Sequence, residues 1–371
     1  MEIQKVIRFH QLILFCMLIG YVSIAISQHT DDDQALIQEI ANLKEAYGYI
    51  QSTSKLLSPQ ETAPGIVSVI TEEEILNSGA RDLIDILRLV PGLDFGTDII
   101  NTVGLSMRSN WVYEGGLLLL IDGIEMNERR YGTTQFGFHY PIDHLKKIEI
   151  VRGPGSVLYG GFAKLGVINL ITKNAKDYSG ASIIGRYGQM QRGQGHKQFS
   201  LYAAQKENEY FDWNISGQMA NAHRSDRIYT DSNFQSLDMA DHNISNNLFV
   251  NLGVNYQNLS MRFLFDDHKV ENNDGVSTIS DKLVKNFRTY DFNLKYQRQL
   301  TDDLQINAKF DYSNQVPWSV TEKIDGQSRY TVGILSQRYL TALNFNYAFT
   351  SQLKSTVGIE YSYESFKNLA G

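Results

Sequence analysis

The chain has 371 residues, of which 42% are hydrophobic, 11% are aromatic and 20% are charged, and its formal net charge is −7. This apolar and aromatic content excludes an intrinsically disordered chain, and the acidic balance gives no electrostatic reason to expect a nucleic-acid partner. Only one apolar run approaches the length of a membrane-spanning helix, and it lies at the extreme N-terminus. A bundle of membrane helices is therefore excluded.

The N-terminal apolar run has the pattern of a secretory signal peptide over residues 1–27. Lys5 and Arg8 supply the positive charge, and the apolar core runs from residue 12 to residue 26. A single membrane anchor is the alternative interpretation. Cys16 is the one cysteine of the chain and lies inside this segment, so we expect an exported mature protein without disulfides.

The first half of the mature chain predicts a mixed α/β domain. A short amphipathic helix is expected over residues 31–46, and a polar stretch follows it. Thr71 and Glu74 have the spacing of a capping box, which predicts a helix that ends at Gly79. A second helix is expected over residues 82–90. Apolar runs predict strands over residues 66–70, 117–121, 145–151 and 166–172.

After residue 176 the apolar residues recur at every second position up to the end of the chain, which is typical of strands with one polar and one apolar face. This alternation predicts nine strands, over residues 180–188, 197–205, 209–219, 246–256, 259–267, 288–299, 304–313, 337–349 and 353–365. Their connections alternate between short turns and long segments, the long ones being 220–245, 268–287 and 314–336. An outer-membrane β-barrel has this arrangement, because its periplasmic turns are short and its outer loops are long.

An antiparallel membrane barrel needs an even number of strands. Nine strands therefore predict an incomplete barrel, and a plugged barrel of about 22 strands fits the mixed domain that comes first. The expected fold is an α/β plug domain followed by part of an antiparallel transmembrane β-barrel. The expected domains are a signal peptide (1–27), a periplasmic extension (28–60), the plug (61–176) and the partial barrel (177–371).

Several sequence blocks between residues 52 and 173 carry a family resemblance. They are residues 63–71, 79–83, 87–92 (Leu-Arg-Leu-Val-Pro-Gly), 119–123 (Leu-Leu-Ile-Asp-Gly), 148–160 and 166–173. In this order they resemble the plug of the TonB-dependent outer-membrane receptors, whereas the barrel matches only in pattern. The resemblance implies a receptor in the bacterial outer membrane, in contact with its lipid, that takes up a scarce external ligand.

The resemblance also implies a coupling segment ahead of the plug. This TonB box adds a strand to the energy-transducing inner-membrane protein, and the stretch in the matching place comprises Tyr47, Gly48, Tyr49, Ile50, Gln51, Ser52 and Thr53. Strand addition uses main-chain hydrogen bonds and tolerates many side chains. A simple linker is the alternative interpretation of this stretch.

Two further sets of site residues follow from the resemblance. In the family, arginines at the positions of Arg108 and Arg152 pair with barrel glutamates and lock the plug. Here the segment Leu105-Ser106-Met107-Arg108-Ser109 has serine where the family usually has glycine, and ordinary surface arginines are the alternative. The expected apical loops, 95–115 and 128–140, carry the candidate ligand contacts Trp111, Tyr113, Tyr131, Phe136, Phe138, His139 and Tyr140. Packing of several of these rings against the barrel wall is the alternative.

No cofactor, catalytic site or metal site is expected. There is no H-E-x-x-H motif, and the spacing of Gly155 and Gly160 lacks the Lys-Ser/Thr pair of a phosphate loop. Asp266, Asp267 and His268 are expected at an outer loop tip, where they hold a cation or are simply solvated. A ferric chelate is the expected ligand, with cobalamin, a glycan or another metal chelate as alternatives. A signalling receptor and a truncated, non-functional remnant are the competing hypotheses.

Overall fold

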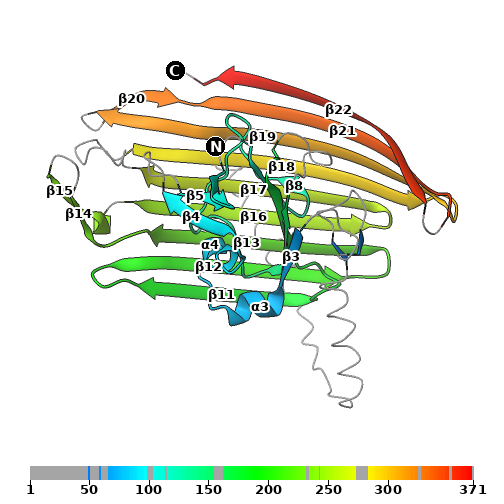
Figure 1. Ribbon diagram of the computed structural model, residues 1–371, viewed down its shortest axis with the longest axis horizontal. Helices are drawn as coiled ribbons and strands as arrows, with labels where there is room; N and C mark the ends of the chain where they lie inside the picture. The colour runs from blue at the N-terminus through cyan, green and yellow to red at the C-terminus, as the bar shows by residue number, and fades with distance from the viewer. Residues whose placement is uncertain are drawn as a thin grey trace, which may run out of the picture.

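The computed structural model describes residues 66–97, 103–112, 115–153, 162–230, 234–241, 243–272, 283–324, 327–350 and 353–369, together with the backbone of Tyr49–Ile50 and Ser58–Pro59. The predicted signal peptide and the helix expected over residues 31–46 lie outside these ranges. Figure 1 shows two parts, a small mixed domain and a wide curved sheet along which it lies.

The small domain, here called the plug, is built on a five-stranded sheet with the strand order β3-β9-β10-β7-β8. Only the β10–β7 pair is parallel, and the other neighbours are antiparallel. Every residue of β7 and β10 is buried, as expected for central strands that are covered on both faces. The bounds are β3 Ile66–Thr71, β7 Leu117–Ile121, β8 Ile124–Glu125, β9 Leu145–Arg152 and β10 Gly166–Thr172.

Two short helices follow β3, and both lie within the ranges predicted for them, although the second is shorter than the predicted 82–90. The helix α3 (Glu72–Asn77) begins at the capping box, in which the Thr71 backbone N–H donates to the Glu74 carboxylate at 2.7 Å. The helix α4 (Leu83–Leu87) begins at Asp82, whose side chain accepts from the Asp85 N–H. Gly79 adopts φ +66° after α3, which favours glycine.

A second plug sheet was not predicted from the sequence. Its strands are β4 (Leu93–Thr97), β5 (Val103–Met107) and β6 (Asn110–Trp111). Gly96 and Gly104 face each other across β4 and β5, and the Trp111 ring lies directly over them. Glycine is uncommon in strands, which explains why no strand was predicted here.

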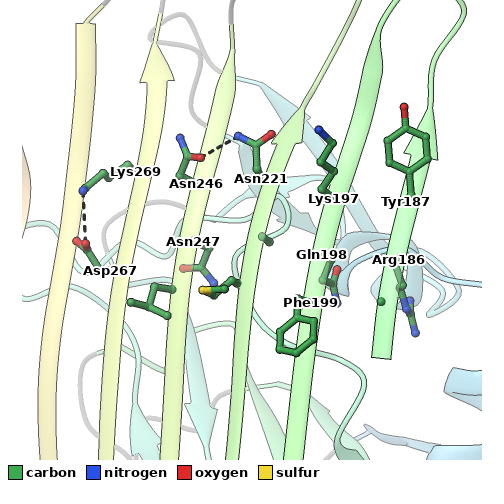
Figure 2. Close-up of a pocket in the computed structure, with 14 residues that line it drawn as sticks. Arg186, Tyr187, Lys197, Gln198, Phe199, Asn221, Asn246, Asn247, Asp267 and Lys269 are labelled. Atoms are coloured by element: carbon green, nitrogen blue, oxygen red, sulfur yellow. Dashed lines mark hydrogen bonds and ion pairs between the residues drawn. The ribbon is translucent and has the colours of Figure 1, made fainter. Parts of the chain in front are cut away.

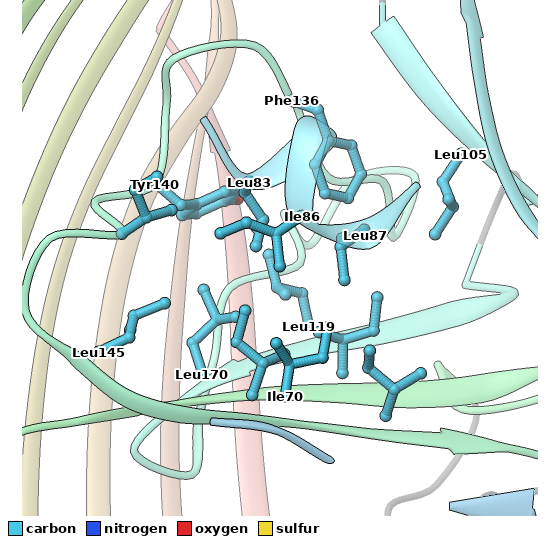
Figure 3. Close-up of a cluster of buried hydrophobic side chains, with 14 of the residues drawn as sticks. Ile70, Leu83, Ile86, Leu87, Leu105, Leu119, Phe136, Tyr140, Leu145 and Leu170 are labelled. Carbon is cyan, nitrogen blue, oxygen red and sulfur yellow. The ribbon is translucent and has the colours of Figure 1, made fainter. Parts of the chain in front are cut away.

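The plug core lies between α4 and the central strands. Leu83, Ile86 and Leu87 of the helix pack with Leu119 and other residues of the sheet, as Figure 3 shows. The same cluster includes Phe249 and Leu264, which are fully buried and belong to the wide sheet. The apolar core of the plug therefore continues into the barrel wall, and burial of these side chains holds the two parts together.

Within the described residues, the wide sheet follows the chain in the strand order β11-β12-β13-β16-β17-β18-β19-β21-β22, with every pair antiparallel and β20 paired to β19. The nine predicted strands are confirmed. The bounds are β11 Gly180–Gln189, β12 Gln194–Lys206, β13 Phe211–His223, β16 Ile244–Tyr256, β17 Leu259–Asn272, β18 Leu283–Gln299, β19 Leu304–Ile324, β20 Gln327–Val332, β21 Ile334–Ala348 and β22 Lys354–Asn368.

Several strands are longer than predicted at the end that carries the long connections. Residues 268–272 extend β17 and residues 314–324 extend β19, although both stretches were expected in loops. A small hairpin of β14 (Ile228–Thr230) and β15 (Ser236–Asp238) forms inside the expected loop 220–245. Polar residues dominate these extensions, so the alternation that marks a membrane strand is absent from them.

Alternate residues of each strand point to opposite faces of the wide sheet, one toward the plug and the other away from it. On β16, Asn247, Phe249 and Asn251 are buried against the plug, whereas Leu248 and Leu252 are exposed on the other face. The same division continues across the neighbouring strands. In the described residues, no helix has both the length and the apolar character needed to cross a bilayer.

Candidate functional site

The candidate site is the interface at which the plug meets the inner face of the sheet. The turn between β7 and β8 enters this interface first, because Asp122 and Gly123 adopt positive φ values of 51° and 80°. Aspartate tolerates this left-handed conformation better than most residues. The turn therefore presents the Asp122 carboxylate to the barrel wall.

Asp122 is a hydrogen-bonding centre between plug and barrel. Its carboxylate accepts from the Thr172 N–H at 2.9 Å and from the Thr172 hydroxyl at 2.7 Å, both within the plug. From the barrel, Arg262 forms an ion pair with it at 2.7 Å and the Asn251 amide donates at 3.2 Å. One mostly buried carboxylate thus joins β10 of the plug to β16 and β17 of the barrel.

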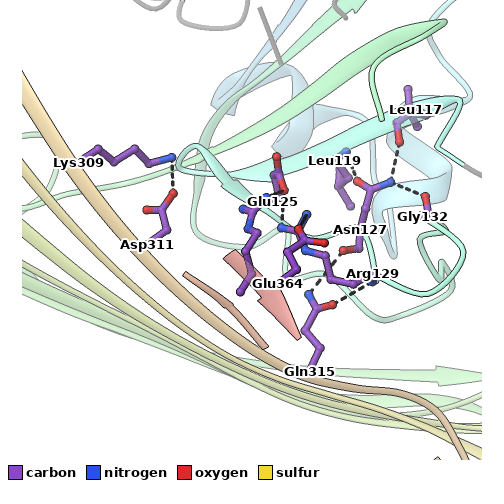
Figure 4. A network of polar contacts seen from close by, with 11 residues as sticks. Leu117, Leu119, Glu125, Asn127, Arg129, Gly132, Lys309, Asp311, Gln315 and Glu364 are labelled. Atoms are coloured by element: carbon purple, nitrogen blue, oxygen red, sulfur yellow. Dashed lines mark hydrogen bonds and ion pairs between the residues drawn. The ribbon is translucent and has the colours of Figure 1, made fainter. Parts of the chain in front are cut away.

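Glu125 forms a second ion-pair centre three residues further on, shown in Figure 4. Arg338 of β21 lies 2.8 Å from its carboxylate, and Arg129 of the plug contacts the same oxygen. Arg129 also lies 3.9 Å from Glu364 of β22. Burial alone would raise the pKa of Glu125, but the positive charges of Arg129 and Arg338 outweigh it and lower the pKa.

The plug segment after Glu125 is ordered by its own hydrogen bonds. The Asn127 side chain accepts from the Leu119 N–H at 2.9 Å and donates to the Leu117 and Gly132 carbonyl oxygens, each at 2.7 Å. Gln315 of β19 accepts from the Arg129 N–H at 3.1 Å. These contacts place the Arg129 guanidinium between plug and barrel.

Asp143 forms a third centre, at the β11–β12 edge of the sheet. Its buried carboxylate forms an ion pair with Arg186 and accepts from Gln198 at 2.8 Å and from Ser200 at 2.6 Å. The next residue, His144, packs against Tyr202, and burial lowers its pKa to about 4, so this imidazole is neutral near pH 7.

His139 connects the predicted apical segment to β17. Its Nε2 lies 2.7 Å from the Asp266 carboxylate and its Nδ1 lies 2.8 Å from the Gln135 carbonyl oxygen. The ring stacks on His268 at a centroid distance of 3.9 Å. Both ring nitrogens of His139 therefore have an oxygen partner, one in the plug and one in the barrel.

The two predicted lock arginines have other surroundings. Arg152 donates to the Pro91 carbonyl oxygen at 2.7 Å and to the Ser68 hydroxyl at 2.9 Å, so its guanidinium joins β3 to the turn before β4. The Arg108 side chain is exposed. Among the described residues, neither arginine forms an ion pair with a barrel glutamate. Three plug-to-barrel ion pairs of the described residues have the opposite polarity, because Asp122, Glu125 and Asp143 of the plug meet arginines of the barrel. The longer contact between Arg129 and Glu364 has the predicted polarity, but it involves another arginine.

The candidate ligand contacts divide into two groups. Phe136, His139 and Tyr140 are 3–5% exposed and pack in the plug core or against β17, so they present no surface to a ligand in this conformation. Trp111 and Tyr131 are about 40% exposed, and Tyr131 meets Trp318 edge to face. Phe138 is partly buried and stacks on His196. Tyr113 lies outside the described residues.

The predicted coupling segment is described only at Tyr49 and Ile50, which form the short strand β1. This strand pairs antiparallel with β2 (Ser58–Pro59), so that Ile50 faces Ser58. The other members of the segment, Tyr47, Gly48, Gln51, Ser52 and Thr53, lie outside the described residues.

The structure corrects the place of the candidate cation residues. Asp266, Asp267 and His268 lie within β17 instead of at a loop tip, and alternate residues point to opposite faces. Throughout the described part of the chain, no group of three or more His, Cys, Asp or Glu residues is arranged to hold a metal ion.

Comparison with known proteins places this geometry in a family. Residues 59–167 match the model of the TonB-dependent Receptor Plug Domain. The chain is 31% identical over 116 residues to the Vitamin B12 transporter BtuB of Vibrio vulnificus, a match that spans 31% of this chain and 19% of that protein. It is 34% identical over 148 residues to the Iron-regulated outer membrane virulence protein of Vibrio cholerae, which spans 37% of this chain and 22% of the relative.

Solved receptors share the fold. The ferric-catecholate import receptor Fiu of E. coli aligns with a TM-score of 0.61 at 16% identity, over 87% of this chain and 53% of that one. The alcaligin outer-membrane receptor FauA of Bordetella pertussis aligns with a TM-score of 0.61 at 15% identity, over 94% and 62%. The chain thus spans between half and two thirds of these receptors' length. Its plug matches the TonB-dependent receptor family over residues 59–167, and its unclosed sheet shares the fold of part of the receptor barrel.

Replacement of Asp122 tests the first interface centre. In Asp122→Ala, the Arg262 charge loses its partner and a non-glycine residue without a local hydrogen bond must keep a positive φ. We expect a loss of about 3–5 kcal/mol in plug stability, measured by proteolysis of the plug in increasing urea. Asp122→Asn is the matched variant, and it should lose less because it keeps the turn conformation and an acceptor for the Thr172 N–H. Equal losses would show that neither the turn nor these bonds matter.

Proposed function

We propose that this chain is the plug and the first barrel strands of an active transporter that takes up a scarce chelate across the outer membrane. The observation that supports the proposal is the way the plug is held, because three ionic and hydrogen-bonded centres at Asp122, Glu125 and Asp143 join it to the barrel beside the apolar contacts of Phe249 and Leu264. Polar contacts of this kind can re-form in another arrangement. A purely structural domain would gain more stability from apolar packing than from buried ion pairs.

The proposed energy source is an inner-membrane partner of the TonB type. β1 is an extended segment ahead of the plug, and its only described neighbour is the two-residue strand β2. Such a short strand pair is only marginally stable in water, so a strand of the partner can replace β2 as the neighbour of β1. The partner would then pull on the chain just before β3, an edge strand of the plug sheet.

A ferric chelate is the proposed ligand, and the relative from Vibrio cholerae supports it because its name describes it as iron-regulated. Cobalamin is the second candidate, because the other relative is a vitamin B12 transporter of similar identity. In both cases the exposed rings of Trp111 and Tyr131 are the proposed plug contacts, since aromatic faces pack on planar ligands.

Growth of a strain that depends on this receptor separates the candidates. With a ferric chelate as ligand, the strain should grow on that chelate under iron limitation, and growth should disappear when the gene is deleted. Growth restored by cobalamin alone would select the second candidate. Growth that is independent of the receptor under both limitations would contradict uptake of either ligand.

A further inference from the structure

A row of polar side chains crosses the outer face of the sheet at one level. The register places five of them as direct cross-strand neighbours on β11, β12, β13, β16 and β17. They are Tyr187, Lys197, Asn221, Asn246 and Lys269. The Asn221 amide donates to Asn246 at 2.8 Å, as Figure 2 shows, so the middle of the row is joined across two strands.

This polar row marks the upper limit of an apolar band. Below Asn246, the outward side chains of β16 are Leu248, Val250, Leu252 and Val254, followed by Tyr256 at the short turn. At about 3.4 Å per residue, the eight steps from Leu248 to Tyr256 cover about 27 Å along the strand. Because a membrane barrel's strands are tilted, this length fits the apolar band of about 25 Å that outer-membrane barrels present to lipid.

The row lies at the outer-leaflet side of the band. The opposite ends of these strands are joined by tight turns, such as the one between β16 and β17 at Gln257 and Asn258. At the end with the polar row, the connections that follow β13 and β17 are longer, although β11 and β12 are joined by a short turn. Short turns face the periplasm in this class of barrel. The polar row therefore stands at the depth of the outer lipid head groups.

A hollow of about 760 Å³ lies on this face, directly at the row (Figure 2). Its outward lining combines the polar row with the exposed side chains of Phe199, Met219 and Leu248 one level below, and with the Asp267 carboxylate beside Leu248 on β17. Gly185, the neighbour of Phe199 at that level, contributes no side chain, and the space where its Cβ would lie is open. The hollow thus has an apolar floor toward the membrane centre and a polar rim above it.

The rim is positively charged. Lys197 and Lys269 stand at its two sides, about 14 Å apart across three strand spacings. Lys269 lies 3.6 Å from Asp267, but Arg288 shares the same carboxylate at 3.2 Å, so the positive charges outnumber the negative one. Within the described residues, no carboxylate contacts Lys197, whose side chain is exposed.

We propose that this hollow binds an anionic, phosphate-bearing lipid of the outer leaflet, with phosphate groups at Lys197 and Lys269 and an acyl chain over Phe199, Met219 and Leu248. Lysine at this depth directs its ammonium to the head groups while its stem covers apolar surface. The separation of the two strands that carry these lysines suits two phosphates on one head group. This site is independent of the transport ligand, because it faces away from the plug.

The test is lipid binding by the purified detergent-solubilised protein, with diphosphorylated lipid A as the probe. The double variant Lys197→Gln/Lys269→Gln should bind it about 25-fold more weakly, since each lysine near an anionic lipid surface contributes about fivefold. The charge-matched control Lys164→Gln/Lys206→Gln removes two exposed lysines elsewhere and should bind as the wild type does. Heat-dependent migration in gel electrophoresis verifies that each variant is folded.

Three further probes decide between the possible anion sources. Monophosphorylated lipid A should bind more weakly than the diphosphorylated form, and phosphatidylcholine should not compete with it. Inorganic phosphate should compete only at concentrations far above those of the lipid. Unchanged affinity in the double variant, equal binding of phosphatidylcholine, or equal competition by inorganic phosphate would each overturn the proposal.

Discussion

Replacing Glu125 with glutamine or alanine should release the plug from the barrel wall more readily than any other single change described above. Arg129 is 4% exposed and Arg338 is 11% exposed, and both lose their shared carboxylate in these variants. An uncompensated buried charge costs about 3–5 kcal/mol. We expect a corresponding loss of plug retention, measured as increased single-channel current and as plug proteolysis at lower urea concentration.

Arg81→Ala is the control for this experiment. Arg81 pairs with Asp85 inside the plug, but its side chain is 64% exposed, and exposed ion pairs contribute about 0–1 kcal/mol. A double-mutant cycle between Glu125→Gln and Arg338→Met measures the interaction free energy of this plug-to-barrel ion pair, because both substitutions remove the same pair. A coupling energy near zero would show that the pair does not hold the plug.

The dependence on pH gives a second test of the same pair. The folded pKa of Glu125 lies below its usual value of 4.5. The ion pair therefore stabilises the folded state above about pH 4.5, and this contribution is lost as the pH falls through the folded value. Wild type and Glu125→Gln should differ at pH 7 and converge in strong acid. A difference that persists unchanged in strong acid would assign the effect to something other than this charge.

The sequence was informative where one local rule determines the structure. Strict alternation of apolar and polar residues located all nine strands of the wide sheet, because the lipid-facing and plug-facing environments differ at every second residue. The capping pair of Thr71 and Glu74 located α3 for a similar reason, since both partners lie within one helical turn.

The interface could not be predicted in the same way, because its partners are distant in sequence. Asp122 meets Arg262 and Glu125 meets Arg338, and no local pattern connects these residues. The family resemblance predicted arginines on the plug, at Arg108 and Arg152, and glutamates on the barrel. The pairs of Asp122 and Glu125 have the carboxylate on the plug and the arginine on the barrel. One usable signal was present, because Arg186, Arg262 and Arg338 all occupy plug-facing positions of the alternating strands, where a positive charge requires a partner.

The strand β1, ahead of the plug, is the segment proposed to couple the receptor to an energy source by strand addition. Proline has no N–H group and cannot complete a strand ladder, so Ile50→Pro should abolish energy-dependent uptake. Ligand affinity at the outer face should not change, because the proposed contacts lie on the plug. Ile50→Ala keeps the backbone N–H and should transport almost normally. Ser58→Pro disturbs the β1–β2 pair from its other side and should leave coupling intact.

The decisive measurement is the rate of uptake of a radiolabelled ferric chelate by cells that carry each of these three variants, with binding of the same chelate measured in parallel. Coupling by strand addition predicts loss of uptake with normal binding in Ile50→Pro alone. Normal uptake by Ile50→Pro would contradict it.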